Sequence, residues 1–211
     1  WVKISVDQTG IYQLTYQDLQ NMGFSRPENI KVFGYGGNML PEHFNQEARL
    51  ADDLPEIPIY MEKGGDGVFN TGDYILFYAQ GPTKVTYNSN SSSFTHTQNP
   101  YSTKGYYFLT TDAGQGKRIS KQAAENGKSF TSITKTYRYF YHEKELENLL
   151  KSGRDWYGET FNAEKNTLTL TFNIPHITTD NIYLNACYIG KGEGLHRLIL
   201  DTESESNSLL V

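Results

Sequence analysis

The chain has 211 residues, which is enough to bury a sizeable core and to form two units of moderate size. Its 16 Tyr, 11 Phe and 19 Gly favour many short strands joined by turns, so we predict an all-β fold of two packed β-sandwich-like units with short helices. With 19 Lys and Arg against 24 Asp and Glu the net charge is -5, and nucleic acid is not an expected partner.

The ends and the cysteine content restrict the class of protein further. The chain begins at Trp1 without an initiator Met or an apolar signal segment, which is typical of a processed or trimmed fragment, and no stretch approaches membrane-spanning length. The single cysteine, Cys187, excludes an internal disulfide and a cysteine-built zinc site.

The opening of the chain predicts a hairpin followed by a short helix. Residues 1–6 and 11–14 have the alternation of a strand pair, with a turn pattern between them. Thr15 is a suitable N-cap with Asp18 three residues later, and Gly23 is a suitable C-cap, so we predict a helix over residues 16–22.

A glycine cluster follows the strand predicted over residues 30–33. Gly34, Gly36 and Gly37 invite comparison with a phosphate-binding loop, but no Lys-Ser/Thr pair and no amphipathic helix follow them. The pattern therefore favours a tight turn.

Residues 74–79 are an unbroken run of apolar and aromatic side chains. The run is too short to span a membrane and is rich in strand-favouring types, so it predicts a central strand buried on both faces. Gly72-Asp73 before it and Gly81-Pro82 after it are turn residues.

The loop before this strand is dense in oxygen-bearing side chains, and Asp66 and Asp73 are its calcium candidates. Its spacing does not match an EF-hand, and Asp, Asn and Gly are common in turns, so an ordinary turn is the favoured interpretation and no metal or other cofactor is expected. Beyond the strand, residues 87–100 are polar enough to predict an exposed loop, and residues 106–111 resume the sheet.

A polar, glycine-punctuated stretch at residues 113–129 predicts a boundary between an amino-terminal β domain, residues 1–130, and a second β-sandwich-like domain, residues 131–211. Whether the second domain is truncated stays open. It contains a helical pattern over residues 143–150 and three strand patterns, at residues 167–172, 182–189 and 195–200.

The pair His142-Glu143 resembles the start of a zinc-peptidase motif. That motif needs a second His four residues after the first, and position 146 is Leu, so this chemistry is excluded.

Opposite charges surround two aromatic residues in the loop at residues 151–161. One interpretation is structural, with Trp156 as an anchor; the other is a docking surface of aromatic and charged side chains. The residues of that candidate surface are Arg154, Asp155, Trp156, Tyr157 and Glu159.

Cys187 lies in an apolar strand pattern with no helix amino terminus nearby to activate a thiolate. The pattern predicts a buried, structural cysteine, and none of the five His residues is assigned to it as a base.

Several short motifs, taken in order, resemble the amino-terminal region of the sortases of the type IX secretion system, which are gingipain-type cysteine peptidases. The resemblance covers about residues 2–161. Its segments are residues 6–15 (VDQTGIYQLT), 33–37 (FGYGG), 40–42 (LPE), 72–82 (GDYILFYAQGP), 105–109 (GYYFL) and 153–159 (GRDWYGE).

The resemblance implies a surface protein whose full-length form cleaves carboxy-terminal sorting signals and attaches cargo to the outer membrane. It implies location at the extracellular face of that membrane or secretion. In the family the chemistry belongs to a later caspase-like domain whose catalytic motifs are not found in this chain. No catalytic residue is therefore assigned, and the expected partners are a downstream peptidase domain, secreted cargo or other secretion components.

Two functions remain open at this point. One is a non-catalytic region that supports the peptidase domain or positions cargo. The other is a carbohydrate-binding or adhesin module, suggested by the high Tyr content and by Tyr101, Trp156 and Tyr157, which could stack on sugar rings.

Overall fold

The computed structural model describes residues 1–41, 53–112, 114–123, 132–153, 155–202 and 206–210. The chain divides into two compact units, Trp1–Tyr139 and Phe140–Val211. The boundary predicted at residues 130 and 131 stays a prediction, because residues 124–131 lie outside the described part.

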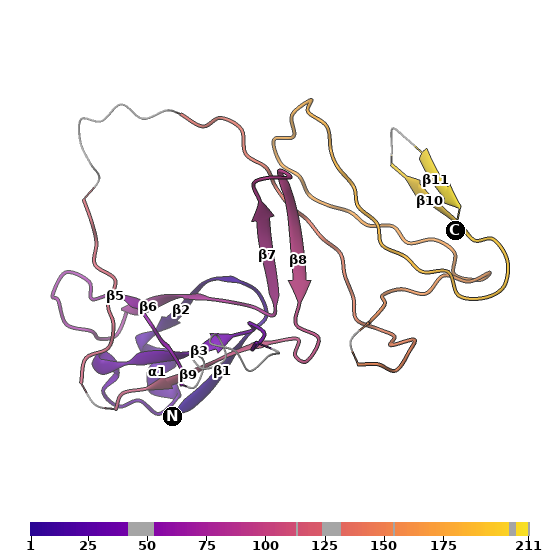
Figure 1. Cartoon of the computed structure of the whole chain (residues 1–211). Coiled ribbons are helices and arrows are strands. Elements are labelled where there is room, and N and C mark those ends of the chain that lie inside the picture. The colour runs from indigo at the N-terminus through magenta and orange to yellow at the C-terminus, as the bar shows by residue number, and fades with distance from the viewer. Residues whose placement is uncertain (42–52, 113, 124–131, 154, 203–205, 211) are drawn as a thin grey trace. The chain divides into compact units, whose positions relative to one another are not determined.

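The first unit contains a four-stranded antiparallel sheet (Figure 1). Its strands, in spatial order, are β1 (Val2–Val6), β9 (Gly105–Thr110), β3 (Lys31–Gly36) and β4 (Glu56–Ile57). Side chains alternate between the two faces of a strand, and in β1 this places Val6 in the core. In β9, Tyr107 and Leu109 are two residues apart, so both face the core.

A second, three-stranded antiparallel sheet has the predicted central strand in its middle. Its order is β2 (Gly10–Thr15), β6 (Tyr74–Ala79) and β5 (Ile59–Glu62). The prediction that β6 is buried on both faces is wrong. Ile75, Phe77 and Ala79 are buried, but Tyr78 on the opposite face is 54% exposed.

The two sheets share one hydrophobic core. Val32 and Leu109 from the first sheet pack in the same cluster as Ile59 and Ile75 from the second. The predicted hairpin of residues 1–14 does not form: β1 pairs with β9 and β2 pairs with β6, so the turn between them carries the chain from one sheet to the other. A two-stranded hairpin alone is marginally stable in water, whereas β1 and β2 each join a sheet of three or more strands.

The predicted helix is present as α1 (Tyr16–Asn21). Thr15 and Asp18 form the full capping box, since Thr15 Oγ1 accepts from the Asp18 N–H at 3.1 Å and Asp18 Oδ2 accepts from the Thr15 N–H at 2.8 Å. Leu19 is fully buried and fixes the helix to the core. A 3₁₀ turn, η1 (Pro27–Asn29), follows.

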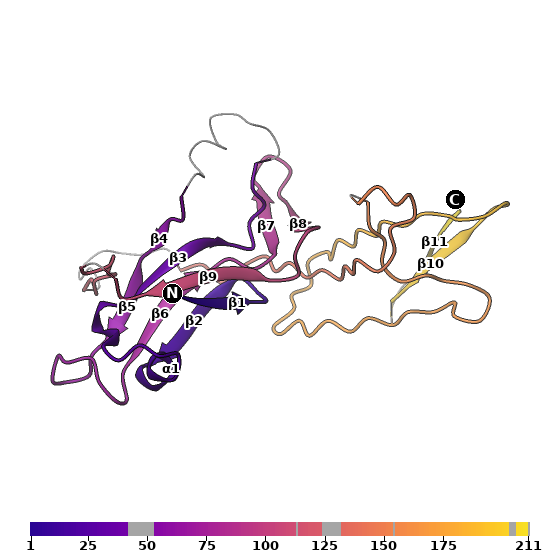
Figure 2. The same cartoon turned by 90° about the horizontal axis from the view of Figure 1, so that it is seen from below.

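Residues 87–100 are not an open loop. They belong largely to a hairpin of β7 (Thr83–Asn88) and β8 (Ser93–Gln98), which extends away from both sheets (Figures 1 and 2). These strands were not predicted because their residues are mostly polar. They are stabilised by a cross-strand pair, in which Tyr87 is opposite Phe94 with ring centroids 4.9 Å apart. The Tyr139 ring stacks on Phe94, at 5.5 Å between centroids.

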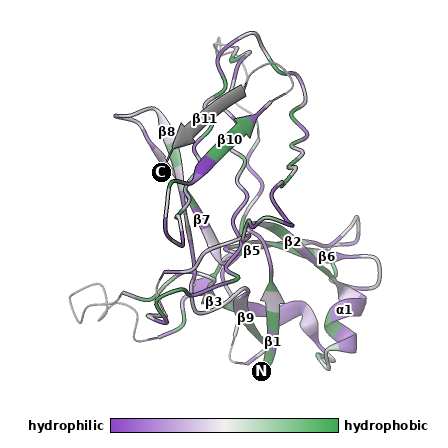
Figure 3. Cartoon of the chain, turned by 90° about the vertical axis from the view of Figure 1, so that its right-hand side faces the viewer, coloured by the Kyte–Doolittle hydropathy of each residue, from purple (hydrophilic) through white to green (hydrophobic). Residues whose placement is uncertain are grey.

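The second unit has less regular structure. It contains the hairpin of β10 (Arg197–Asp201) and β11 (Ser206–Leu210), in which β10 has a hydrophobic middle between charged ends (Figure 3). Strands predicted at residues 167–172 and 182–189 are not formed. The predicted helix at residues 143–150 is also absent, and Leu146 and Leu150 are 60% and 74% exposed.

The all-β class with short helices is confirmed, since the regular structure consists of antiparallel sheets with one short α-helix and one 3₁₀ turn in the described part. No helix among the described residues has the length and apolar content to cross a membrane.

Candidate functional site: a cleft beside a glycine junction

Three of the sequence motifs meet at one point of the first unit. Gly36 and Gly37 at the end of β3, Gly81 after β6 and Gly105 at the start of β9 form what we call the glycine junction. A Cβ on Gly105 would lie 2.6 Å from the Gly37 nitrogen and 2.6 Å from the Gln80 oxygen, and a Cβ on Gly81 would lie 2.6 Å from the Gln8 carbonyl carbon. Only glycine permits this approach of backbones.

Hydrogen bonds fasten the junction across long stretches of sequence. The Gly37 N–H donates to the Gln80 carbonyl at 2.9 Å, and the Gln80 N–H donates to the Tyr107 hydroxyl at 2.7 Å. The Gly81 N–H donates to Thr9 Oγ1 at 3.0 Å, and Asn99 Nδ2 donates to the Gly37 carbonyl at 3.0 Å. The glycines predicted to make a tight turn therefore join both sheets.

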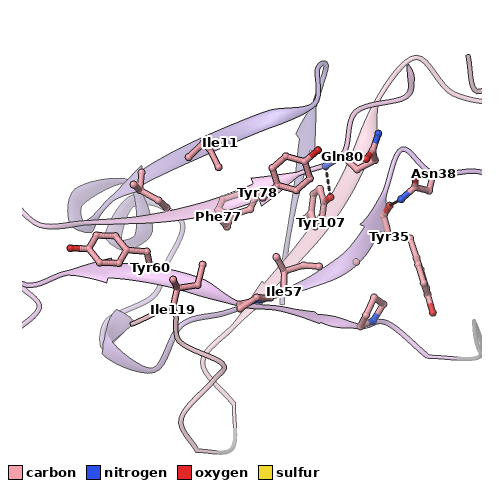
Figure 4. Close-up of a pocket in the computed structure, with 14 residues that line it drawn as sticks. Ile11, Tyr35, Asn38, Ile57, Tyr60, Phe77, Tyr78, Gln80, Tyr107 and Ile119 are labelled. Carbon is pink, nitrogen blue, oxygen red and sulfur yellow. Dashed lines mark hydrogen bonds between the residues drawn. The ribbon is translucent and has the colours of Figure 1, made fainter. Parts of the chain in front are cut away.

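A cleft of about 620 Å³ opens next to this junction. Figure 4 shows Tyr60 and Ile119 at one end of it, Gln80 and Asn38 at the other, and the Tyr78 ring between them. No Lys, Arg, His, Asp or Glu side chain is among the described residues that line it. The volume lies within the usual range for ligand pockets, and the lining is largely aromatic and aliphatic.

The cleft exists because β5 is shorter than its neighbour. β5 pairs with β6 only as far as Phe77, whereas β2 pairs with β6 as far as Ala79. Pro58 comes directly before β5 and has no N–H to donate, which ends the ladder at this point. The end of β6 thus borders the cleft.

An ion pair lies next to Tyr60, outside the lining of the cleft. The Tyr60 hydroxyl donates to the Glu62 carboxylate, and Lys121 Nζ lies 3.2 Å from Glu62 Oε2. The bond from Tyr60 and the neighbouring ammonium lower the pKa of Glu62. At the other end, burial raises the pKa of Tyr107, so its hydroxyl stays neutral as an acceptor for Gln80.

The predicted docking residues fall in the second unit, apart from this cleft in sequence. Trp156 is 37% exposed, and its Nε1–H donates to the Gly153 carbonyl at 3.3 Å. Tyr157 exchanges backbone hydrogen bonds with Glu147. Asp155 is exposed, and Arg154 lies outside the described residues. A docking role for this loop stays a prediction.

Glu159 has the most strongly perturbed carboxylate of that loop. Its Oε1 lies 2.9 Å from His142 Nε2 and 3.1 Å from Lys144 Nζ. Hydrogen bonds from His142 and Lys144 lower the pKa of Glu159 from 4.5 to about 2. The same contacts hold residues 142–147 against residues 157–160, so they also explain part of the local structure.

Both calcium candidates already have hydrogen-bond partners in their own loop. Asp66 accepts from the Val68 N–H at 2.9 Å and from Asn70 Nδ2 at 2.9 Å, and Asp73 accepts from the Asn70 N–H at 2.8 Å. These bonds are sufficient to explain the two residues as turn formers.

Cys187 is exposed and lies in a segment without regular structure, so the prediction of a buried strand cysteine is wrong. Alternating apolar residues become strands only when a partner strand and a covering layer are available, and the neighbouring Ile182 and Tyr183 are 67% and 86% exposed.

The cleft residues Tyr78, Ile11 and Ile119 were not predicted from the sequence. A signal was present in Ile57-Pro58-Ile59, where a proline interrupts an apolar strand pattern and predicts a short or edge strand. The position of the cleft also depends on which strands pair, which this local pattern does not specify.

No family model and no curated protein matches the sequence. Among solved structures, the chain is similar to the crystal structure of dimeric latent PorU from Porphyromonas gingivalis, with 41% sequence identity and a TM-score of 0.47. The likeness covers 58% of this chain and 10% of the PorU chain.

Proposed function

We propose that the chain is a non-catalytic amino-terminal region of a PorU-like sortase of the type IX secretion system. In this role it supports the peptidase domain of a gingipain-type cysteine peptidase or positions secreted cargo for signal cleavage and surface attachment. Its location would be the extracellular face of the outer membrane, or the protein would be secreted.

The observation behind this proposal is that residues from several of the ordered motifs meet in the glycine junction. The glycines at 36–37, 81 and 105 allow close backbone contact, and the polar groups of Gln80 and Tyr107 hydrogen-bond within the same junction. Motifs used in this way build a rigid scaffold, whereas catalytic motifs present reactive side chains. The motif order and the partial likeness to PorU support the family named in the proposal.

Binding to a peptidase region tests the supporting role. The chain is titrated with the separately expressed peptidase region of a PorU-like sortase in a calorimeter, and we expect saturable one-to-one binding. Gly37→Val should weaken it, while Gly65→Ala, at a site with open space around the Cβ, should not. Absence of binding to the peptidase region and to a purified cargo protein would overturn the proposal.

A glycan array separates this function from carbohydrate binding. Saturable glycan binding that Tyr101→Ala abolishes, combined with no binding to the peptidase region, would favour the adhesin alternative. Tyr101 is 72% exposed, so the substitution leaves the fold intact.

The non-catalytic assignment is tested at Cys187. In the full-length protein, Cys187→Ser should leave peptide cleavage unchanged. Loss of cleavage with an unchanged melting temperature would instead identify Cys187 as a nucleophile.

A further inference from the structure

The hydrogen bonds of β5 show on which side of β6 the N–H and C=O groups of Tyr78 point. The Ile59 N–H donates to the Lys117 carbonyl at 3.2 Å, and the Ile59 carbonyl accepts from the Ile119 N–H at 2.8 Å. Both groups of Ile59 thus point away from β6, and its opposite residue, Phe77, directs its own groups to β2. Because direction alternates along a strand, the Tyr78 N–H and C=O point away from β2, toward the cleft.

No described strand continues the ladder opposite Tyr78, where the chain has Pro58. The next residue with the same direction, Gln80, has partners for both groups: its N–H bonds to Tyr107 and its carbonyl to Gly37. The cleft therefore has a main-chain donor and acceptor between a closed ladder on one side and the glycine junction on the other.

We propose that the cleft binds an extended, uncharged peptide segment of a second protein, which pairs with Tyr78 and continues the β5–β6 ladder. A peptide is favoured over other ligands because an N–H and a C=O at one strand position match the groups of another strand. This inference depends on the cleft geometry and goes beyond the proposed function.

The residues that line the cleft indicate which side chains the bound peptide should have. With no charged side chain in the described lining, a charged residue of the peptide would lose its hydration without gaining a partner. Ile11 and Tyr78 are opposite each other on the outer face of the sheet and are 66% and 54% exposed. Alternate residues of a strand share a face, so the favoured sequence has aliphatic residues at every second position.

The test uses a fluorescently labelled hexapeptide with blocked ends, in which Thr and Leu alternate, and the full chain. Fluorescence anisotropy should show saturable binding. Tyr78→Glu should weaken it by at least about tenfold, because the peptide would then desolvate a carboxylate in an apolar cleft. Tyr101→Glu is the matched control and should bind like the parent, since Tyr101 is also an exposed tyrosine and does not line the cleft.

A second peptide, methylated on its central backbone nitrogens, tests the ladder itself. It keeps the side chains but cannot donate to Tyr78, so its binding should also fall by at least about tenfold. Equal binding of both peptides, no binding of either, or equal binding by the parent and Tyr78→Glu would each overturn the proposal. So would self-association of the chain that Tyr78→Glu abolishes while the peptide fails to bind. Unchanged melting of Tyr78→Glu verifies its fold.

Discussion

At the scale of single residues, two glycines differ only in their surroundings. A Cβ on Gly37 would collide with the Gly81 carbonyl carbon and the Pro82 nitrogen, both backbone atoms, whereas Gly65 has nothing within 4 Å. Backbone atoms cannot rotate away as a flexible side chain can. The glycine junction is therefore sensitive to one added methyl group, and the loop of Gly65 is not.

We expect Gly37→Val to destabilise the first unit by about 1 to 3 kcal/mol or more, because strands of both sheets must move to admit the side chain. Urea unfolding measures this as a lower midpoint with an unchanged slope. Gly65→Ala is the control and should stay within about 0.5 kcal/mol of the parent. Equal midpoints for Gly37→Val and the parent would show that the junction is loose.

Tyr107→Phe removes a hydroxyl while keeping the ring that packs edge-on against Phe77. The Gln80 N–H would lose its acceptor, and we expect a loss of about 1 to 3 kcal/mol. Tyr12→Phe, whose hydroxyl bonds to Gln8 at an exposed site, should cost less. A larger loss for Tyr12→Phe would contradict this assignment.

The raised pKa of Tyr107 adds a pH dependence. The contribution of the neutral Tyr107 hydroxyl to folding stability is complete below the pKa of tyrosine in the unfolded chain, about 10. It is lost as the pH rises through the higher pKa of Tyr107 in the folded protein. Tyr107→Phe should remove this part of the alkaline destabilisation.

At the scale of elements, residues 142–147 and 157–160 of the second unit are held by paired backbones and by charge. The folded-state pKa of Glu159 is lowered to about 2, so its contribution is present above its ordinary pKa of 4.5 and is lost as the pH falls toward 2. We expect this unit to lose stability between those two pH values. Glu159→Gln should reduce the pH dependence, and the exposed Glu193→Gln should keep it. Identical acid profiles for the two variants would rule out this role.

How far sequence predicts these elements depends on whether the deciding interaction is local. The helix at Thr15 and Asp18 was predictable because its capping box lies within one turn. β6 was predictable because Tyr74, Ile75, Phe77 and Tyr78 favour strands and the run has no polar residue. The helix expected at residues 143–150 failed because a single isolated helix of this length is marginal, and Leu146 instead donates its N–H to the Tyr157 carbonyl.

The candidate site shows the same limit. The glycine-rich motifs were visible in the sequence, but their meeting point depends on pairing between residues far apart in the chain. Tyr78 was predicted to be buried because the sequence of β6 does not reveal that the core covers only one face of its sheet. Which face is covered depends on contacts with strands far away in the chain.

At the scale of the whole molecule, the division into two units predicts two unfolding steps. We expect calorimetry to resolve separate transitions, since each unit has its own internal contacts. Gly37→Val should lower the transition of Trp1–Tyr139, and Glu159→Gln at pH 5 that of Phe140–Val211. A single transition that both variants shift equally would mean that the units unfold together.

The glycine junction also has a consequence for how fast the first unit folds. Three of its hydrogen bonds join residues separated by 27, 62 and 72 positions, so long loops must close before the junction is complete. Loop closure costs chain entropy before the new contacts return any free energy, and folding rates fall as contacts become less local. The junction should therefore form late, after α1 and the β7–β8 hairpin, whose contacts are local. Until it closes, the edges of both sheets stay available to other chains, so the slowest step in folding is also the interval of greatest exposure to aggregation.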